Sequence, residues 1–293
     1  MSENIKKQDK KVQISFIFWE IILFSLTLFL GIATSFQISR FMGIQQASVS
    51  PINPWQFIFS FALGTLLILS VIFFIKSKTK KGIIFKALFI FVIFWGILLT
   101  LDVWLESLFS FSGAVFALFL SFFLIFLLLK RPSVLIHNIC IILGIAGVGA
   151  ILGLRISPET MVIFLIIFSI YDFIAVYKTK HMITMAKEMV EHRAILALIV
   201  PPKISGFKGN MKEVKAGGKF LILGGGDIAF PLMLCSSLIS RNVFSSLIVA
   251  VFSIIGFLFS FFIFINQKER KPIPALPPIA LFCILGYLIT LII

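Results

Sequence analysis

The chain has 293 residues, of which 60% are hydrophobic and only 13% charged, and its mean hydropathy is +1.12. A water-soluble chain carries roughly a quarter charged residues and about half apolar ones. A soluble domain is therefore excluded, and the apolar excess must face lipid. The net charge of +14 would indicate a nucleic-acid partner in a soluble protein. Here the basic residues flank apolar runs, and no nucleic-acid partner is expected.

Uncharged apolar runs predict membrane-spanning helices, because a helical span needs about 20 mostly apolar residues. Nine such runs are present, and the predicted fold class is an all-α polytopic membrane protein with nine transmembrane helices. The predicted spans are Ser15–Phe36, Trp55–Ile75, Ile83–Leu101, Phe109–Leu129, Val134–Leu154, Met161–Tyr177, Phe220–Ile239, Phe244–Ile265 and Pro278–Ile293.

The basic residues predict the orientation of these spans, because Lys and Arg near span ends are retained on the cytoplasmic side. With the amino terminus inside, all of them except Arg40, Arg155 and Arg241 fall on that side. The amino terminus is therefore predicted to be cytoplasmic and the carboxyl terminus to be outside. We expect a multi-pass protein of the cell membrane, surrounded by the lipid bilayer.

One long polar connection divides the predicted spans into two groups. Residues 1–177 are expected to form a six-span bundle, residues 178–219 a cytoplasmic loop and residues 220–293 a three-span part. Within the loop, Met182–Val200 alternates apolar and charged residues, which predicts an amphipathic helix at the inner membrane surface. Pro201 and Pro202 end that helix, and the Gly-, Lys- and Asn-rich stretch to Gly218 predicts a flexible tether.

The cysteines and histidines do not form a recognisable ligand set. No Cys-x-x-Cys spacing is present, and neither is a His-Glu-x-x-His or Gly-x-Ser-x-Gly motif. The histidines are isolated and are expected to be interfacial or solvated. No metal and no cofactor is therefore expected. These residues are Cys140, Cys235, Cys283, His137, His181 and His192.

Two acids lie inside apolar runs, where an ionised carboxylate costs about 2.5–3.5 kcal/mol. Asp172 precedes Lys178 by six residues and Asp227 follows Lys219 by eight, which puts them roughly 9 Å and 12 Å from the inner boundary. Two adjacent antiparallel spans would bring these carboxyl groups together inside the membrane. Glu20, in contrast, lies near the inner end of its span, where water is expected to reach it.

Paired carboxylates share one proton and titrate as a unit. The ionised member can take a proton from water while the protonated member polarises a carbonyl oxygen, which predicts peptide hydrolysis with a water nucleophile. No Lys or Arg lies at the same depth in a span, which disfavours a buried salt bridge. A secondary transporter or cation channel that uses the same two acids for ion coupling stays open as an alternative.

Glycines and prolines lie close to the acids. Gly224, Gly225 and Gly226 directly precede Asp227, and three glycines loosen a helix and let a substrate segment or water approach the carboxylate. The glycines at 144, 147, 149 and 153 have instead the spacing of a helix-packing surface. The stretch Pro272–Pro278 is predicted to be extended, which at membrane depth requires burial in protein or a water-filled cavity.

Three short motifs occur in order in spans six, seven and nine: Tyr171-Asp172, Gly224-x-Gly226-Asp227 and Pro274-Ala275-Leu276. This trio resembles the motifs of the presenilin and signal peptide peptidase family of intramembrane aspartyl proteases. With the pair His181-Met182 after the first aspartate, the chain looks most like archaeal presenilin homologues.

The resemblance implies a role for each motif. Asp172 and Asp227 would be the catalytic pair, and Tyr171 would border the active site. Pro274, Ala275 and Leu276 would shape the substrate cleft and hold the Asp227 span in place. A bound substrate would pair as a strand with the backbone of Phe220, Leu221, Ile222 and Leu223.

The resemblance also implies the substrate, which is a transmembrane helix of another protein. The cytoplasmic amino terminus resembles the presenilin branch and implies substrates whose own amino terminus is outside. Compared with presenilin, the connection between spans six and seven is short. Obligate partner subunits are therefore not expected.

Overall fold

The structure is a computed structural model that describes residues 2–41, 78–109, 111–179, 181–215, 218–267 and 272–293, together with isolated residues between 55 and 70. The described part is mostly helical. Its helices are α1 (Ser2–Phe41), α3 (Lys78–Phe109), α4 (Phe111–Lys130), α5 (Val134–Arg155), α6 (Pro158–Phe173), α7 (His181–Glu191), α8 (Gly225–Leu238), α9 (Val243–Ile265) and α10 (Leu276–Thr290).

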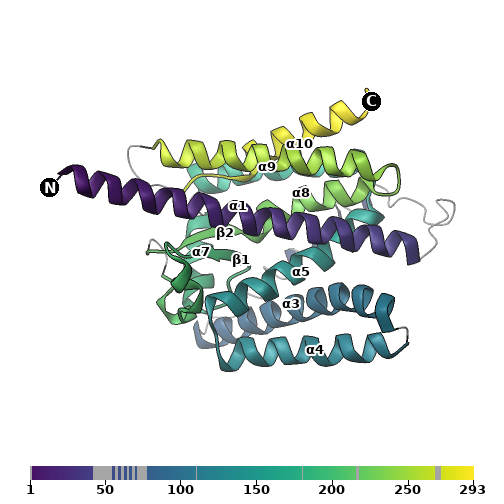
Figure 1. Cartoon of the computed structure of the whole chain (residues 1–293), viewed down its shortest axis with the longest axis horizontal. Coiled ribbons are helices and arrows are strands. Elements are labelled where there is room, and N and C mark those ends of the chain that lie inside the picture. The colour runs from purple at the N-terminus through teal and green to yellow at the C-terminus, as the bar shows by residue number, and fades with distance from the viewer. Residues whose placement is uncertain are drawn as a thin grey trace.

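Six helices of the described part are long and apolar enough to cross a membrane, and α8 and α10 are shorter apolar helices. The predicted second span, Trp55–Ile75, lies mostly outside the described residues. Figure 1 shows the long helices running in roughly the same direction, with the two termini at opposite ends of the molecule. Many large apolar side chains of these helices are exposed on the outer surface, as expected where lipid is the solvent.

Capping side chains explain where several helices begin. The Ser133 hydroxyl accepts a hydrogen bond from the Ile136 N–H at the start of α5, and the Ser157 hydroxyl accepts one from Thr160 at the start of α6. Asn242 does the same for α9. Each cap satisfies one of the N–H groups that lack a partner in the first helical turn. The predicted spans Val134–Leu154 and Phe244–Ile265 accordingly agree with α5 and α9 to within one residue.

The glycines predicted to pack helices do so on both sides of α5. A Cβ atom on Gly144 or Gly147 would meet α3, and a Cβ on Gly149 or Gly153 would meet α8. Without side chains, the backbones of the three helices approach closely. The central helix α5 thereby fixes α8, which carries Asp227. The predicted role of these four glycines in packing is confirmed.

The prediction of an amphipathic helix over Met182–Val200 is wrong for its second half. Helix α7 ends at Glu191, and Ala197–Val200 forms strand β1. The helix ends because Arg193 adopts a left-handed conformation, with φ of 53°, and Ala194 N–H bonds to Met189 O at 2.9 Å. This is a Schellman ending with Arg193 in the place that glycine usually takes.

Strand β1 pairs with a second strand, β2 (Leu221–Gly224), in an antiparallel two-stranded sheet. Ile199 lies opposite Ile222, and Ala197 lies opposite Gly224. The all-α prediction therefore omits a sheet, and the predicted span Phe220–Ile239 is a helix only from Gly225 onward. In Figure 1 the sheet and α7 lie at the end of the molecule where the chain begins, beneath the first half of α1.

The predicted flexible tether to Gly218 is largely ordered in the described residues. It contains two short 3-10 helices, η2 (Ile204–Lys208) and η3 (Met211–Glu213). Phe207 and Met211 are buried, and the ring of Phe207 lies 5.2 Å from that of Trp19 on α1. The prediction is wrong because these two apolar side chains pack into the core and hold the segment, although its composition is rich in glycine.

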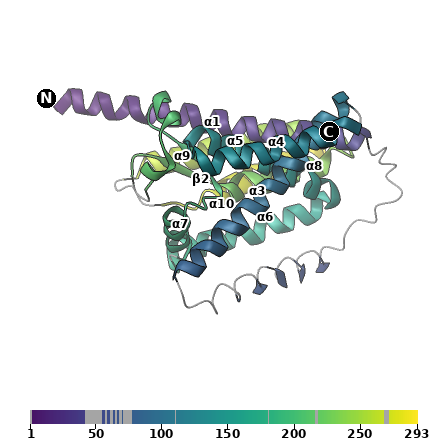
Figure 2. The ribbon, with the colours of Figure 1, turned by 90° about the horizontal axis from the view of Figure 1, so that it is seen from below.

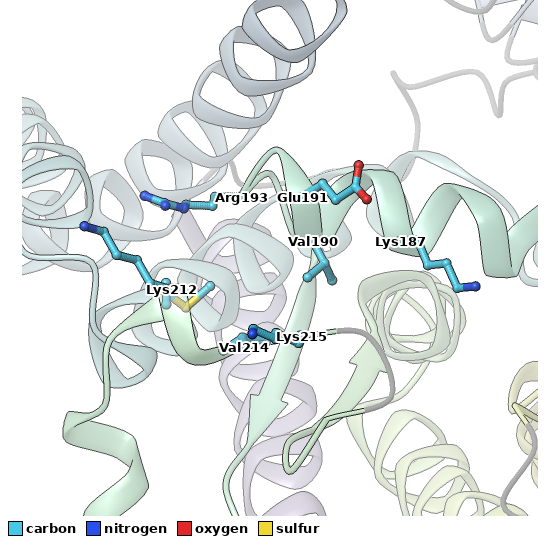
Figure 3. A pocket seen from close by; sticks show the side chains of 8 residues that line it. Lys187, Val190, Glu191, Arg193, Lys212, Val214 and Lys215 are labelled. Carbon is cyan, nitrogen blue, oxygen red and sulfur yellow. The ribbon is translucent and has the colours of Figure 1, made fainter. Parts of the chain in front are cut away.

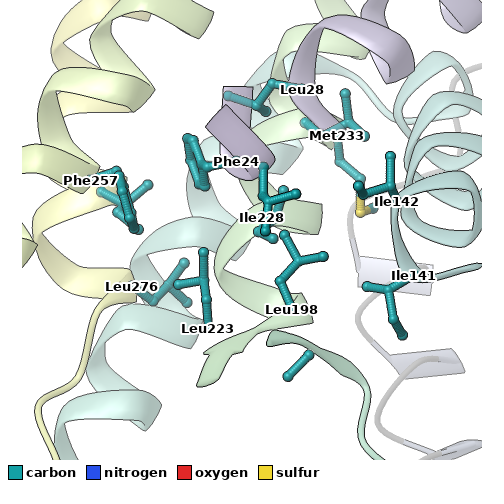
Figure 4. Close-up of a cluster of buried hydrophobic side chains, with 14 of the residues drawn as sticks. Phe24, Leu28, Ile141, Ile142, Leu198, Leu223, Ile228, Met233, Phe257 and Leu276 are labelled. Atoms are coloured by element: carbon teal, nitrogen blue, oxygen red, sulfur yellow. The ribbon is translucent and has the colours of Figure 1, made fainter. Parts of the chain in front are cut away.

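Helix α6 packs against α8 and α10, and α1 packs against α5, α8 and α9. Figure 2 shows α6 on the side of the molecule away from α1. A single core of buried apolar side chains joins these elements, and Figure 4 shows the part of it around β1, β2 and the start of α10. The two helices that carry the aspartates are therefore held by one continuous core.

Candidate active site

Asp172 lies in the last turn of α6 and is buried, with 5% of its surface exposed. Its Oδ2 accepts a hydrogen bond of 3.3 Å from the N–H of Leu276. Directly after α6 the chain forms a π-helical turn, η1 (Ile174–Lys178). Single π turns are frequent at functional sites because they change the direction of side chains locally.

Asp227 lies in the first turn of α8, two residues after the helix begins. It is partly exposed and is close enough to Asp172 to interact with it electrostatically. The sequence places these two acids 55 positions apart, and the contact of α6 with α8 brings them together. The structure thus places the two predicted acids on helices that pack against each other.

The glycine run forms the junction between β2 and α8. Gly224 caps the helix, and a Cβ on it would lie 2.9 Å from Oδ2 of Asp227. A Cβ on Gly225 would lie 2.7 Å from the carbonyl oxygen of Leu196, which accepts the Gly225 N–H at 2.9 Å. Close approach of backbone therefore requires glycine at 225. Gly226 is exposed and lies against Phe230 at an ordinary distance.

The proline-rich stretch is only partly extended. Residues 272–275 have no regular secondary structure, but α10 begins at Leu276 and includes Pro277 and Pro278 in its first turn. Proline is tolerated there because the first turn of a helix has no internal partner for its N–H. Pro274 and Leu276 are buried, and Ala275 is half-buried. The resemblance implied that this motif holds the Asp227 span in place. The hydrogen bond that the motif forms, from the Leu276 N–H, is instead to Asp172.

A cavity of about 180 Å³ lies beside Asp227. It is lined by residues of α1, β2, α8 and α9 and of the stretch before α10. Asp227, Ala275 and three residues of β2 contribute to its wall, and Phe220 lies just before that strand. The lining residues are Glu20, Leu221, Ile222, Leu223, Asp227, Phe257, Ser260, Phe261, Phe264, Pro272, Ile273 and Ala275. Five of the predicted site residues thus meet at one cavity.

Tyr171 does not line that cavity. Its side chain is 52% exposed, and its ring packs edge-on against Phe168 with 6.4 Å between the centroids. Tyr171 and Asp172 are adjacent on α6, and adjacent helical positions point in directions about 100° apart. Neither Tyr171 nor Asp172 is among the residues that line this cavity, so of the two acids only Asp227 reaches its wall.

Two buried polar side chains on α5 hold strand β1 from its outer edge. The amide of Asn138 donates to Ile199 O at 2.7 Å and accepts from Ile199 N–H at 2.9 Å. Nε2 of His137 lies 3.0 Å from Ala197 O. His137 was expected to be interfacial or solvated, and that expectation is wrong, because only 1% of it is exposed. The overlooked signal was a His-Asn pair inside an apolar run, where polar side chains persist only with partners.

Glu20 is the other residue that sequence reasoning misplaced. It was expected to be accessible to water, but only 6% of it is exposed. It lines the cavity with Asp227 and interacts electrostatically with that residue. Its Oε2 is buried and has no hydrogen-bond partner among the described residues. The difference arises because α8 and α9, which are far away in the sequence, pack against α1.

A second cavity, of about 430 Å³, lies between α7 and η3, and most of the charged residues that line it are basic (Figure 3). None of the predicted site residues contributes to it. Its walls carry four basic side chains and one acidic side chain. The lining residues are Lys187, Val190, Glu191, Arg193, Met211, Lys212, Val214 and Lys215.

Comparison with known proteins agrees with this arrangement. Two solved structures of a presenilin family intramembrane aspartate protease, in different crystal forms, each have 24% sequence identity to the chain and a TM-score of 0.59. The alignments cover 92% of this chain and 94% and 96% of the respective solved chains. At this identity the likeness establishes the fold. No curated protein matches the sequence significantly.

The family model described as signal-peptide peptidase, presenilin aspartyl protease matches residues 19–293. That range contains both aspartates, the glycine run and the proline-rich stretch. The match covers nearly the whole chain, and the fold agrees with it. The chain therefore belongs to the signal-peptide peptidase and presenilin family, and it is an intramembrane aspartic endopeptidase.

Proposed function

We propose that the chain hydrolyses peptide bonds within transmembrane segments of other membrane proteins, with Asp172 and Asp227 as its catalytic pair. The observation that carries this proposal is the packing of α6 against α8, with Asp172 in the last turn of α6 and Asp227 in the first turn of α8. The hydrogen bond from Leu276 to Asp172 supports it, because it fixes the orientation of one carboxyl group.

In this proposal the two carboxyl groups share one proton and act on a water molecule between them. The ionised carboxylate takes a proton from water as the water oxygen attacks the peptide carbonyl carbon. The protonated carboxyl group donates a hydrogen bond to the carbonyl oxygen, where negative charge develops. The C–N bond then breaks, and the departing nitrogen takes up the proton from the first carboxyl group.

The proposed position of the substrate is the free edge of β2. Because Asn138 occupies both backbone groups of Ile199, these groups point away from β2. Ile199 and Ile222 are therefore a non-hydrogen-bonded pair, and the N–H and C=O of Ile222 point away from β1. An extended substrate can add to this edge as a third strand. Gly224, Gly225 and Gly226 would then leave room between that strand and Asp227.

The proposed topology has nine spans, a cytoplasmic amino terminus and an outside carboxyl terminus, in the cell membrane. The distribution of basic residues supports it, and so does the position of the termini at opposite ends of the molecule (Figure 1). Residues 1–177, 178–219 and 220–293 would be the six-span bundle, the cytoplasmic loop and the three-span part. Substrates with an outside amino terminus follow from this orientation, and no partner subunit is required.

The test is to reconstitute the purified chain in lipid vesicles with a single-span protein and to detect fragments by mass spectrometry. The parent chain should cut within the apolar segment of the substrate. Asp172→Ala and Asp227→Ala should each lose at least about a thousandfold in rate, because each removes a group that acts in the transition state. Asp102→Ala removes an acid from α3 instead and serves as the matched control.

Cleavage by either aspartate variant at the parent rate would contradict the proposal. Family membership does not favour the transporter or channel alternative, and the same vesicles test it directly. Ion or solute flux that depends on Asp172 and Asp227, without any fragments, would support that alternative instead.

A further inference from the structure

Glu20 is a buried acid that lines a cavity with Asp227, and the proposed chemistry does not use it. It is 94% buried, and its Oε2 has no hydrogen-bond partner in the described part of the chain. A buried polar atom without a partner costs free energy, more so when it is charged. Such an atom beside a cavity indicates that a bound group from outside the chain supplies its hydrogen-bond partner.

The cavity that Glu20 lines is large enough for a side chain. Its volume of about 180 Å³ exceeds by an order of magnitude the 10–15 Å³ that a single water needs. Phe257, Phe261 and Phe264 give one wall an apolar surface, and Ser260 adds a hydroxyl group. Among the described residues of the lining, the ionisable ones are Glu20 and Asp227, both acidic.

This combination has the chemistry of a site for a basic side chain. A lysine side chain has a long apolar stem and a compact charged end that carries three hydrogen-bond donors. The aromatic wall suits the stem, and the carboxylate of Glu20 suits the ammonium group. An acidic side chain would be repelled by Glu20 and Asp227 together.

The position of the cavity relative to β2 connects it to the substrate. Leu221, Ile222 and Leu223 all line it, and β2 is the strand to which an extended substrate would add. Side chains of an added strand alternate between the two faces of the sheet. One or two side chains of the bound segment would therefore enter the cavity next to Asp227.

The depth of Glu20 fits the same occupant. Glu20 follows Ser15, where the apolar part of α1 begins, by five residues or about 7.5 Å of helix. In the proposed orientation this is the cytoplasmic side, where the ends of membrane spans carry an excess of Lys and Arg. A lysine side chain of the substrate is long enough to reach Glu20 while the substrate backbone stays paired with β2.

From these observations we propose that the cavity is a substrate subsite in which Glu20 selects a basic side chain, with lysine as its occupant. The proposal rests on the proteolytic function proposed above. Glu20 is a specificity-determining residue in it, and it takes no part in breaking the peptide bond.

The experiment uses the full-length chain in vesicles and a family of single-span substrates. Lys, Met or Gln is placed in turn at each position around the cleavage site, and kcat/KM is measured for each substrate. At one position, Lys should be preferred over Met and Gln by about tenfold or more, the range expected for a hydrogen bond to a charged group. Acetylation of that lysine, which removes its charge, should abolish the preference.

The Glu20→Gln variant should reduce the preference for Lys over Met to less than about twofold, because it removes the charge and keeps the shape. Glu106→Gln changes an exposed acid on α3 and should leave the tenfold preference intact. If Glu20→Gln fails to fold, the comparison of Lys, Met, Gln and acetyl-lysine substrates on the parent chain still tests the subsite, because that comparison needs no variant of the enzyme.

The subsite is disproved if no position favours Lys, if acetyl-lysine is cut as well as lysine, or if the preference survives in Glu20→Gln. These outcomes all require cleavage, and they leave the protease function standing. A complete lack of fragments, or equal cleavage by Asp227→Ala, would instead show that the protease function itself is wrong.

Discussion

Gly225 occupies a position where any side chain would meet the backbone of another segment. A Cβ there would lie 2.7 Å from the carbonyl oxygen of Leu196, at the end of the sheet. The neighbouring Gly226 has no such constraint, because its nearest contact would be the Phe230 ring at 3.5 Å. Of these two adjacent glycines, Gly225 is therefore required by the close backbone contact, whereas the space around Gly226 would admit a side chain.

Gly225→Ala should lower the free energy of unfolding by about 1–3 kcal/mol, because the added methyl group forces β1 and α8 apart. Thermal unfolding of the purified chain measures this. Gly226→Ala is the matched control, and its change should be the smaller of the two. Equal destabilisation by both substitutions would contradict the contact with Leu196.

At the scale of elements, helix α5 binds the outer edge of the sheet beside the site. Asn138 on α5 forms two hydrogen bonds with the backbone of Ile199, as a neighbouring strand would. That side of β1 is therefore occupied. The sheet can grow only at β2, next to Asp227. The strand pair is short, and two strands alone are marginally stable, so its position depends on α5.

Asn138→Ala should cost about 1–3 kcal/mol of unfolding free energy, because it leaves the buried N–H and C=O of Ile199 without partners. It should also lower cleavage, since a displaced β1 shifts the edge of β2. Unfolding and kcat/KM are measured on the same preparation. Asn266→Ala, at an exposed position after α9, is the control. A stable, fully active Asn138→Ala would show that α5 does not position the sheet.

At the scale of the whole molecule, the site is assembled from segments spread along most of the chain. Glu20 comes from α1, Asp172 from α6, Asp227 from α8, and Leu276 from the start of α10. One buried core joins these elements. A ligand that binds the assembled site should therefore stabilise the entire fold.

An inhibitor that mimics the tetrahedral intermediate should raise the free energy of unfolding by about 2.7 kcal/mol at a hundred times its Kd. The measurement is thermal unfolding with and without inhibitor. Asp227→Ala should show little protection at the same concentration, whereas Asp102→Ala should be protected like the parent chain. Equal protection of Asp227→Ala would place the inhibitor elsewhere.

The prediction of local features succeeded where their cause was local. The helices α5 and α9 agree with the predicted spans because apolar length and a capping residue set their limits. The end of α7 was missed because Arg193 adopts a conformation that usually marks glycine. The strand after it was missed because the apolar run from Ala194 to Val200 fits a buried strand and a helix equally well.

By itself, the sequence determined that the chain is embedded in a membrane and that Asp172 and Asp227 are its distinctive acids. Composition and the cost of a charge in lipid are properties of each segment alone, so no fold is needed to read them. The tertiary structure alone decided that Leu276 binds Asp172, that β1 pairs with β2 and that Glu20 faces a cavity. These contacts join residues far apart in the chain, and their geometry arises only when the helices pack.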